Sequence, residues 1–502
     1  MAHAVLLAGG LLVLAAASCQ PASHPSAGAA ASVASPAPLP DVIAPEGTPR
    51  PPFTFSKDDE ALLDQIEHGA FNFMWHAGDK PGTLGMTPDR TSKPEVSIAG
   101  VGFQLSGIII GIERGWITRG EGEARVLGIL KGIAANPENR KAGLYYHFLN
   151  PASAGQPGAA YEHVVSTIDS ALFFAGVITA SQYFGGEVAT VGDQLVRDAD
   201  WSFFKCTKPG EEGFISLGWE PRDKHKPTGE GRVLPYSWID NGDEHRLVTF
   251  LAACAPDAAH RVDPITYYKM RRTLGSYKGQ PPFVWFPWSG AIFTTQFSHC
   301  WIDYASIGPD DPAAFGIPCR PRVDWWENSR RAMQMQRQKA IDHPERGLSE
   351  HLWGLTASDY AKGYQVPGLF PTRIDMPGCE VGRDYPKEAG KDNFGDGTIA
   401  PYGAGCSIMF DAAAPVDSLR YIHNLKNGTL PRIWDDPAKG GYGLADAFNL
   451  KTGWIAPDHL AIDQGPLLIA IENARTGLIW KLFHQHPFVK DGMQRLGLRV
   501  AR

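Results

Sequence analysis

Glu244 stands where a polar, aromatic-containing loop leads into an apolar segment. The loop covers residues 236–244, and the segment that follows carries Leu247, Phe250 and Leu251. A carboxyl group at such a position can donate or accept a proton during catalysis. An acid in the first turn of a helix can equally complement the helix dipole, so a structural role stays open for Glu244.

Asp169 is a second candidate carboxylate. It ends the Ser-Thr-Ile-Asp stretch 166–169, and Glu162 lies slightly upstream. Hydrolysis of a glycosidic bond needs two such groups, one protonated to donate to the leaving oxygen and one ionised to activate water or attack carbon. Because Ser-x-x-Asp is also an ordinary helix-capping pattern, a cap remains the alternative role for Asp169.

The stretch 296–303 places polar groups between aromatic rings, a composition typical of sugar-binding sites. Gln296, His299 and Asp303 can hydrogen-bond sugar hydroxyls, and Trp301 can present a ring face. Metal ligation by His299 and Asp303 is the weaker interpretation, because no second histidine lies nearby at ligand spacing. A hydrogen-bonded core position is the other alternative for His299.

Three carboxylates in the last third of the chain lie in glycine-rich turns. They are Asp396, Asp446, which follows Tyr442 in one short stretch, and Asp463. Aspartate is a favoured turn and cap residue, so any single one of these is more often structural. Asp463 precedes the apolar residues 467–471 and is predicted to cap their helix.

The composition excludes several classes of protein. The sequence contains no Ser or Cys nucleophile motif, no phosphate-binding glycine loop and no clustered His/Cys metal site, so we expect neither a metal nor another cofactor. A net charge of −7 without a Lys/Arg cluster argues against a nucleic-acid partner. With 43% hydrophobic and 20% charged residues, the chain has the composition of a globular domain.

The elements that must position these side chains are predicted to be helices. Apolar residues recur at helical spacing, and period-two alternation is scarce. Ser56 with Asp59, and Thr118 with Glu121, have the spacing of helix starts. The absence of a sequence repeat favours a closed ring of helix pairs over an open solenoid. Helices are expected from Ser56, from Thr118, and at 96–113, 166–183, 188–204, 243–253, 324–340, 415–425 and 464–483.

The N-terminal region is predicted to direct export. Residues 1–19 contain an apolar run that is too short to span a bilayer and ends at a lipobox-like Leu-Ala-Ala-Ala-Ser-Cys stretch. We expect a bacterial lipoprotein anchored through Cys19 in the periplasm or outer membrane, with a plain secretory signal as the alternative. Residues 20–52 hold nine prolines and are predicted to form a tether, followed by one domain at 53–502. The six other cysteines permit disulfides in an oxidising compartment.

Taken together, these segments resemble the glycoamylase-like domain family, which includes bacterial endo-β-1,2-glucanases and a domain of the cyclic β-1,2-glucan synthases. The resembling segments follow one another in the same order between about residues 160 and 485. They are 166–172, 296–303, 327–330, 353–359, 396–401, 442–449, 462–466 and 471–478.

The resemblance implies an all-α fold, an (α/α)₆ toroid with long loops on its active-site face. It also implies hydrolysis of a β-linked glucan, foremost β-1,2-glucan, by an inverting mechanism. Glu244 would be the general acid, and Asp169, Asp396 and Asp446 would lie in the glucan cleft. The predicted substrate-binding residues are Gln296, His299, Trp301, Asp303, Trp353, Asp396 and Tyr442.

The chain departs from the family pattern just before the Ser-Thr-Ile-Asp stretch. Family members carry carboxylates there, whereas this chain has Asn150, Val164 and Val165, with Glu162 displaced. The base that works with Glu244 is therefore left open among Asp446, Asp169 and Glu162.

Other functions also agree with the sequence. A phosphorylase or transglycosylase could use the same fold. A non-catalytic glycan-binding lipoprotein would keep the Trp-lined cleft but needs no paired acids. A peripheral scaffold of the outer membrane would have no affinity for soluble glucan.

Overall fold

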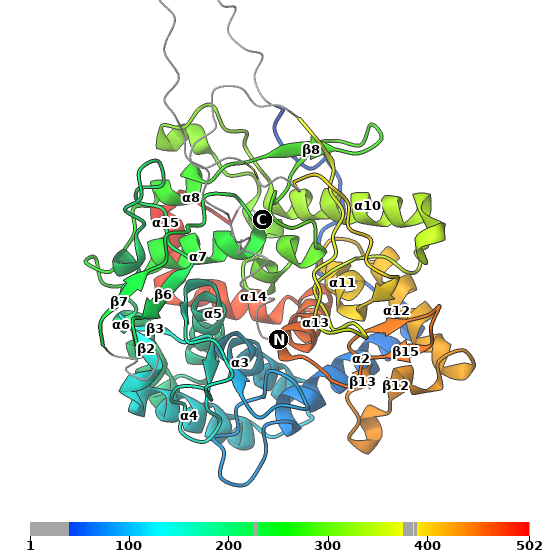
Figure 1. Cartoon of the computed structure of the whole chain (residues 1–502), viewed down its shortest axis with the longest axis horizontal. Helices are drawn as coiled ribbons and strands as arrows, with labels where there is room; N and C mark the ends of the chain where they lie inside the picture. The colour runs from blue at the N-terminus through cyan, green and yellow to red at the C-terminus, as the bar shows by residue number, and fades with distance from the viewer. Residues whose placement is uncertain (1–39, 224–228, 375–384, 386–388, 501–502) are drawn as a thin grey trace, which may run out of the picture.

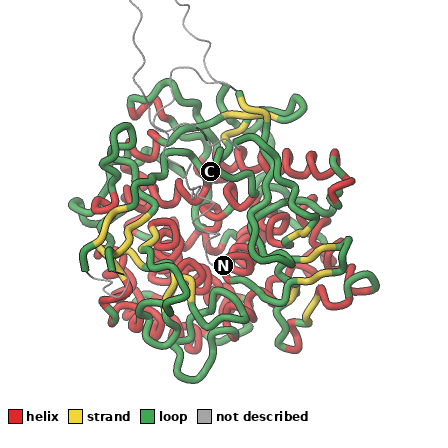
Figure 2. The backbone as a smooth tube through the Cα atoms, viewed as in Figure 1, coloured by secondary structure: helices red, strands yellow, loops and turns green. Residues whose placement is uncertain are grey.

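The computed structural model describes residues 40–223, 229–374, 385 and 389–500 and is rich in helices (Figures 1 and 2). The α-helices are α2 (Lys57–His76), α3 (Ile98–Glu113), α4 (Arg119–Ala135), α5 (Thr167–Phe184), α6 (Gly186–Asp198), α7 (Asp243–Cys254), α8 (Ile265–Lys269), α9 (Tyr304–Ile307), α10 (Trp325–Asp342), α11 (Pro401–Gly405), α12 (Ala414–Asn424), α13 (Ala461–Arg475), α14 (Leu478–Gln485) and α15 (Pro487–Arg495). Three 3₁₀ turns matter for the site: η3 (Ile292–Thr295), η4 (Phe297–Cys300) and η7 (Cys406–Met409).

The strands are short and belong to the connections between helices. Within the described residues they form small antiparallel sheets, ordered β1-β4, β2-β3, β5-β6-β7, β10-β8-β9, β11-β14-β15 and β12-β13. The strands are β1 (Val96–Ser97), β2 (Arg140–Lys141), β3 (Leu144–Tyr145), β4 (Phe148–Leu149), β5 (Val165–Ser166), β6 (Gly218–Pro221), β7 (Gly231–Val233), β8 (Leu274–Ser276), β9 (Phe283–Val284), β10 (Thr372–Arg373), β11 (Thr398–Ile399), β12 (Trp434–Asp435), β13 (Gly443–Leu444), β14 (Phe448–Asn449) and β15 (Trp454–Ile455).

Helix starts follow the capping chemistry of the sequence. Ser56 caps α2 by accepting a hydrogen bond from the Asp59 amide. Thr118 and Glu121 form a reciprocal capping box at the start of α4, as predicted. Each side chain satisfies an amide that has no partner inside its helix.

Three expectations about helix ends are wrong. The segment 464–483 is not one helix, because Gly477 adopts a left-handed backbone with φ of 68° and separates α13 from α14. Asp463 is not the cap of α13, since that helix already begins at Ala461 after the N-cap residue Leu460. The segment 188–204 likewise ends its α-helix early, at Asp198.

A ring of neighbouring contacts joins the segments in the middle of the molecule. Helix α3 packs between α13 and α5, α5 contacts α7, and α7 contacts η3 and η4, while α13 contacts α11 and η7. Gln296, between η3 and η4, donates from Nε2 to Gly403 O at 2.8 Å and to Ser407 Oγ at 2.9 Å. In Figure 1, α4, α6, α10 and α12 lie farther out than α3, α5 and α13.

The closest crossing, between α3 and α5, depends on glycine. A Cβ atom on Gly102 would come within 2.2 Å of Leu172 O, and one on Gly176 within 2.1 Å of Gly102 O. The two backbones can therefore approach only because these side chains are absent.

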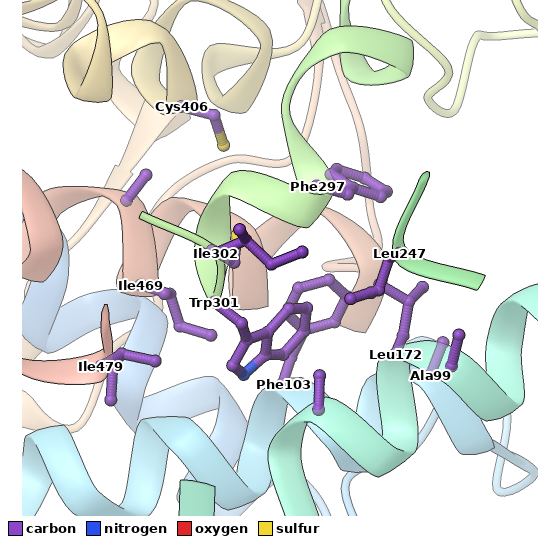
Figure 3. Packing of buried hydrophobic residues seen from close by; sticks show 14 of the residues in the cluster. Ala99, Phe103, Leu172, Leu247, Phe297, Trp301, Ile302, Cys406, Ile469 and Ile479 are labelled. Atoms are coloured by element: carbon purple, nitrogen blue, oxygen red, sulfur yellow. The ribbon is translucent and has the colours of Figure 1, made fainter. Parts of the chain in front are cut away.

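The core lies between these segments (Figure 3). Trp301 is fully buried there and stacks on Phe103 with ring centroids 5.0 Å apart. Its indole nitrogen donates to Ser106 Oγ at 3.0 Å, so η4 is tied to α3 by both packing and a hydrogen bond.

The last part of the predicted tether packs on the domain. Val42 is fully buried, and its backbone pairs with Val323. Arg50 forms an ion pair with Asp324 and lies over the Trp326 ring. The predicted leader 1–19 and most of the tether, residues 20–39, lie outside the described residues. In the part of the chain that the structure describes, no helix is both long and apolar enough to cross a membrane.

Candidate active site

A cavity lies where the N-terminal ends of α5, α7, α11 and α13 meet. Its empty space, counted out to the solvent at its mouth, is about 830 Å³. Amide groups at helix N-termini point outward and favour negative charge, so a cavity at these helix ends suits acidic side chains. The lining residues are Ser166, Ile168, Asp169, Leu172, Trp238, Gly242, Asp243, Glu244, His245, Phe286, Phe293, Thr294, Phe297, Ala357, Tyr364, Val366, Tyr402 and Ile462.

Glu244 lines this cavity from the first turn of α7. Gly242 precedes the helix and offers no side-chain cap. Burial raises the pKa of Glu244 well above its ordinary value, and the negative charges of Asp169 and Asp243 raise it further. Among the described residues, no hydrogen bond or ion pair to the Glu244 carboxyl is found. These surroundings favour the protonated carboxyl, which is the form that can donate a proton.

Asp243, the neighbour of Glu244, has the opposite surroundings. It forms an ion pair with Arg246, and the Ser298 hydroxyl donates to its Oδ1 at 2.7 Å. Arg246 in turn lies 3.8 Å from the centre of the Trp325 ring. Asp243 therefore fastens α7 to η4, although it also borders the cavity.

Asp169 reaches the same cavity from the first turn of α5. Its carboxylate accepts a hydrogen bond from the Ser166 hydroxyl, and its Oδ1 lies 3.5 Å from Nε2 of His147. Burial raises the pKa of Asp169, but the His147 charge and the Ser166 hydrogen bond oppose this shift. Asp169 is thus both a capping-type residue and a cavity carboxylate, so the two alternatives for it are compatible.

His147 contacts the cavity carboxylate Asp169 and was not predicted from the sequence. Its Nδ1 is hydrogen-bonded to Glu162, and its ring stacks on Phe148 at 3.9 Å. Burial alone would lower the pKa of His147, but the charges of Asp169 and Glu162 raise it to about 9. It lies in no recognisable motif, and nothing in the sequence connects it to a glutamate fifteen positions later.

Asp446 and Asp463 form a separate buried pair behind the cavity wall. Asp446 accepts from the Leu460 amide at 3.0 Å, and neither residue lines the cavity. Burial raises the pKa of both carboxyls, and the negative charge of Asp446 raises that of Asp463 further, so the pair holds a proton. Ile462 and Tyr364 line the cavity, and the charge of Asp463 adds to the raised pKa of the half-buried Tyr364.

Four predicted substrate-binding residues are buried in the core, away from the cavity lining. Gln296 and Trp301 form the contacts already described, and Trp353 is fully buried. His299 shares a hydrogen bond of 2.9 Å with Ser329 Oγ, and burial followed by the charge of Arg246 lowers its pKa well below the ordinary value. These side chains support the framework, which agrees with the core alternative for His299.

The other three predicted binding residues also lie outside the cavity lining. Asp303 caps α9 through the Ser306 amide. Asp396 is exposed and accepts from Thr398 in a turn. Tyr442 packs edge-on against Phe73, with ring centroids 5.6 Å apart. Polar residues beside aromatic rings therefore do not identify the residues that line this cavity, because the same composition also occurs in buried connections between helices.

The described features define a helix-rich protein whose helix N-termini surround a cavity lined by carboxylates and aromatic rings. The Glycoamylase family profile, described as "Putative glucoamylase", matches residues 235–487, which is half of the 502-residue chain. The chain belongs to this family.

Named relatives agree in fold. An exo-β-1,2-glucooligosaccharide sophorohydrolase (non-reducing end) from Parabacteroides distasonis is 26% identical over 478 residues, covering 88% of this chain and 58% of that enzyme. A crystal structure described as a "putative glucoamylase" from Bacteroides uniformis is 28% identical, with a TM-score of 0.70, covering 89% of this chain and 99% of that one.

A third relative is more distant and shows the fold alone. The structure of an endo-β-1,2-glucanase from Chitinophaga pinensis with sophorotriose and glucose is 21% identical to this chain, with a TM-score of 0.69. The matching region covers 89% of this chain and 99% of that one. In contrast, the chain spans only 58% of the length of the sophorohydrolase.

Proposed function

We propose that the chain is a glycoside hydrolase that cleaves β-1,2-glucan. The observation that carries the proposal is that Glu244 lines the same cavity as Asp169, and that Asp169 lies beside His147 whereas burial and two neighbouring acids raise the pKa of Glu244. Hydrolysis of a glycosidic bond needs this asymmetry between two carboxyls. The proposed linkage is supported by the names of two relatives, a β-1,2-glucooligosaccharide sophorohydrolase and the endo-β-1,2-glucanase from Chitinophaga pinensis.

We assign the proposed roles as follows. Glu244 donates a proton to the leaving oxygen, and Asp169 activates the attacking water. Glu162 is hydrogen-bonded to His147 and Asp446 to the Leu460 amide, and neither lines the cavity, so both are second choices for the base. For an inverting reaction, the two working carboxyls should lie about 6.5–9.5 Å apart to leave room for water.

The scaffold proposed for this site is an (α/α)₆ toroid. It is supported by the neighbouring contacts of α13, α3, α5, α7 and η4, and by the hydrogen bonds of Gln296 across to α11 and η7. In such a ring, carboxyls that are distant in the sequence meet at one end.

We also propose that the chain is exported and anchored through a lipid at Cys19. Cys319 is disulfide-bonded, a state that persists in oxidising compartments. Cys206, Cys254, Cys300 and Cys406 are buried free thiols. Labelling of the expressed protein with a radioactive fatty acid tests the anchor, and Cys19→Ala should abolish the labelling.

A panel of purified glucans tests the activity. We expect release of reducing ends from β-1,2-glucan and much less from β-1,3-, β-1,4- and α-linked glucans. Proton NMR of the first product should show the anomer of inverted configuration. Binding of β-1,2-glucan without any release of reducing ends would favour a glycan-binding protein, and phosphate-dependent release would favour a phosphorylase.

A further inference from the structure

His147 lies between two carboxylates on different segments of the chain. Its Nδ1 contacts Glu162 in the loop before β5, and its Nε2 lies 3.5 Å from Oδ1 of Asp169 in α5. We infer that His147, present as the imidazolium, is the positioning residue that keeps Asp169 ionised and so divides the acid and base roles between Glu244 and Asp169. The inference rests on the proposed hydrolase function and adds a residue to its machinery.

The position of the ring is fixed by its surroundings. The His147 amide donates to Val164 O at 2.9 Å, and the His147 carbonyl accepts from the Ile98 amide at 2.9 Å. The side chain is almost completely buried and stacks on Phe148. The backbone is hydrogen-bonded on both sides, and each ring nitrogen faces a carboxylate. These contacts hold the imidazole ring in one orientation.

The charges around His147 all favour the imidazolium. Glu162, Asp169 and Asp89 face it from three separate segments, and their negative charges outweigh the effect of burial on its pKa. A neutral imidazole can donate from only one nitrogen, whereas the imidazolium donates from both. The arrangement of one carboxylate at each nitrogen therefore matches the charged form.

The same cation does not serve Glu244. The charged groups that raise the pKa of Glu244 are Asp169 and Asp243, both of them acids, while Arg246 forms an ion pair with Asp243. Asp169 has His147 beside its carboxylate, whereas no ion pair to Glu244 is found among the described residues. Of Asp169 and Glu244, Asp169 is thus the one that loses its proton first.

NMR titration of histidine tests the inference without any reference to activity. In full-length protein labelled with ¹⁵N-histidine, the His147 signal, assigned through its loss in His147→Gln, should stay that of an imidazolium to about pH 9. Glu162→Gln should lower this midpoint. A His147 that titrates at or below the ordinary value of 6.5 in the wild-type protein overturns the inference, whatever the enzyme hydrolyses.

The pH dependence of kcat/KM on β-1,2-glucan supplies the functional test. In His147→Gln the acid limb, which reports ionisation of the base, should move up by about 1–3 pH units, because a nearby positive charge has been lost. His147→Lys, which restores a cation, should move the limb back toward its original position. His163→Gln, which changes a histidine in the loop that carries Glu162, should leave the acid limb unchanged.

The outcomes separate the inference from the proposed function. If wild-type protein releases no reducing ends from any glucan, the hydrolase proposal fails. If the wild type is active and His147→Gln, shown by circular dichroism to be folded, keeps the wild-type acid limb, His147 is only a structural tie and the inference fails. Should His147→Gln not fold, the wild-type titration with Glu162→Gln decides.

Discussion

Charge partners distinguish the carboxyls that border the cavity. Asp243 has an arginine, Asp169 has a histidine, and Glu244 has neither in the part of the chain that the structure describes. Since the cost of burying a carboxylate is offset only by a cation or by hydrogen bonds, the three groups should differ in how readily they ionise. At the scale of single residues, the site depends on which acid lacks a partner.

Replacing Glu244 by Gln should remove the proton donor while preserving the size of the side chain. We expect kcat on β-1,2-glucan to fall by about 10²–10⁴-fold, the contribution typical of a general acid, with little change in the unfolding temperature. Steady-state kinetics and circular dichroism measure the two quantities. Glu138→Gln, at an exposed position, is the matched control. Near-normal turnover by Glu244→Gln would remove Glu244 from the mechanism.

Replacing Asp243 by Asn should act mainly on stability. The change leaves the buried Arg246 without its carboxylate, and breaking a buried ion pair typically costs about 3–5 kcal/mol. Urea unfolding should show the loss in the free energy of unfolding. An unchanged unfolding midpoint would contradict the structural role of Asp243.

The sequence indicates a candidate site residue only where a local pattern, such as a helix start, also lies at the cavity in the folded chain. Glu244 and Asp169 are recognisable because each starts a helix whose N-terminus borders the cavity. His147 and Asp463 are not, because their roles come from contacts with Glu162, Asp169 and Asp446 that chain folding creates. Trp301 looks like a sugar-stacking ring in the sequence, and its burial depends on packing against α3.

Helix starts are the best-predicted feature at the scale of elements. Capping pairs such as Thr118 with Glu121 act within four residues, so the sequence contains all the relevant information. The break at Gly477 was missed because an apolar pattern continues across it. A glycine tolerates both helical and left-handed backbone, and the surrounding structure selects between them.

The crossing of α3 and α5 provides a prediction at this scale. Gly102→Ala would place a methyl group against the backbone of Leu172, and overpacking of this kind typically costs about 1–3 kcal/mol. Thermal or urea unfolding should show the loss. Gly128→Ala in α4 is the matched control, since that position is exposed and has open space for a Cβ. This control should gain about 0.5–1 kcal/mol from helix propensity. Equal effects of both changes would contradict the close approach.

At the scale of the whole molecule, the cavity is a product of helix arrangement. Helices α5, α7, α11 and α13 come from distant parts of the sequence, yet their N-termini meet. Helical periodicity predicts the helices and favours a ring, but it does not predict which helices pack against one another. The choice of neighbouring helices depends on long-range contacts such as the Gly102–Gly176 crossing and the Gln296 hydrogen bonds.

Several buried groups bind a proton more tightly in the folded chain than in the unfolded chain. The free energy of unfolding should therefore decrease as the pH rises above about 6.5. The folded chain keeps the His147 proton up to a pKa of about 9, and burial raises the pKa of Glu67, Glu244 and Asp463 as well. Because the unfolded chain releases these protons at lower pH, the folded state binds more protons and stability declines with pH.

Buried neutral histidines do not reverse this trend. Burial lowers the pKa of His245 to about 3 and that of His484 to about 4. A histidine with a lowered pKa adds stability as pH rises toward its ordinary value of 6.5, and its contribution is constant above that value. Unfolding temperatures measured from pH 6.5 to 9 should therefore decrease, and Asp446→Asn, which relieves the repulsion on Asp463, should make the decrease smaller. A flat or rising profile would show that the folded protein does not hold these protons.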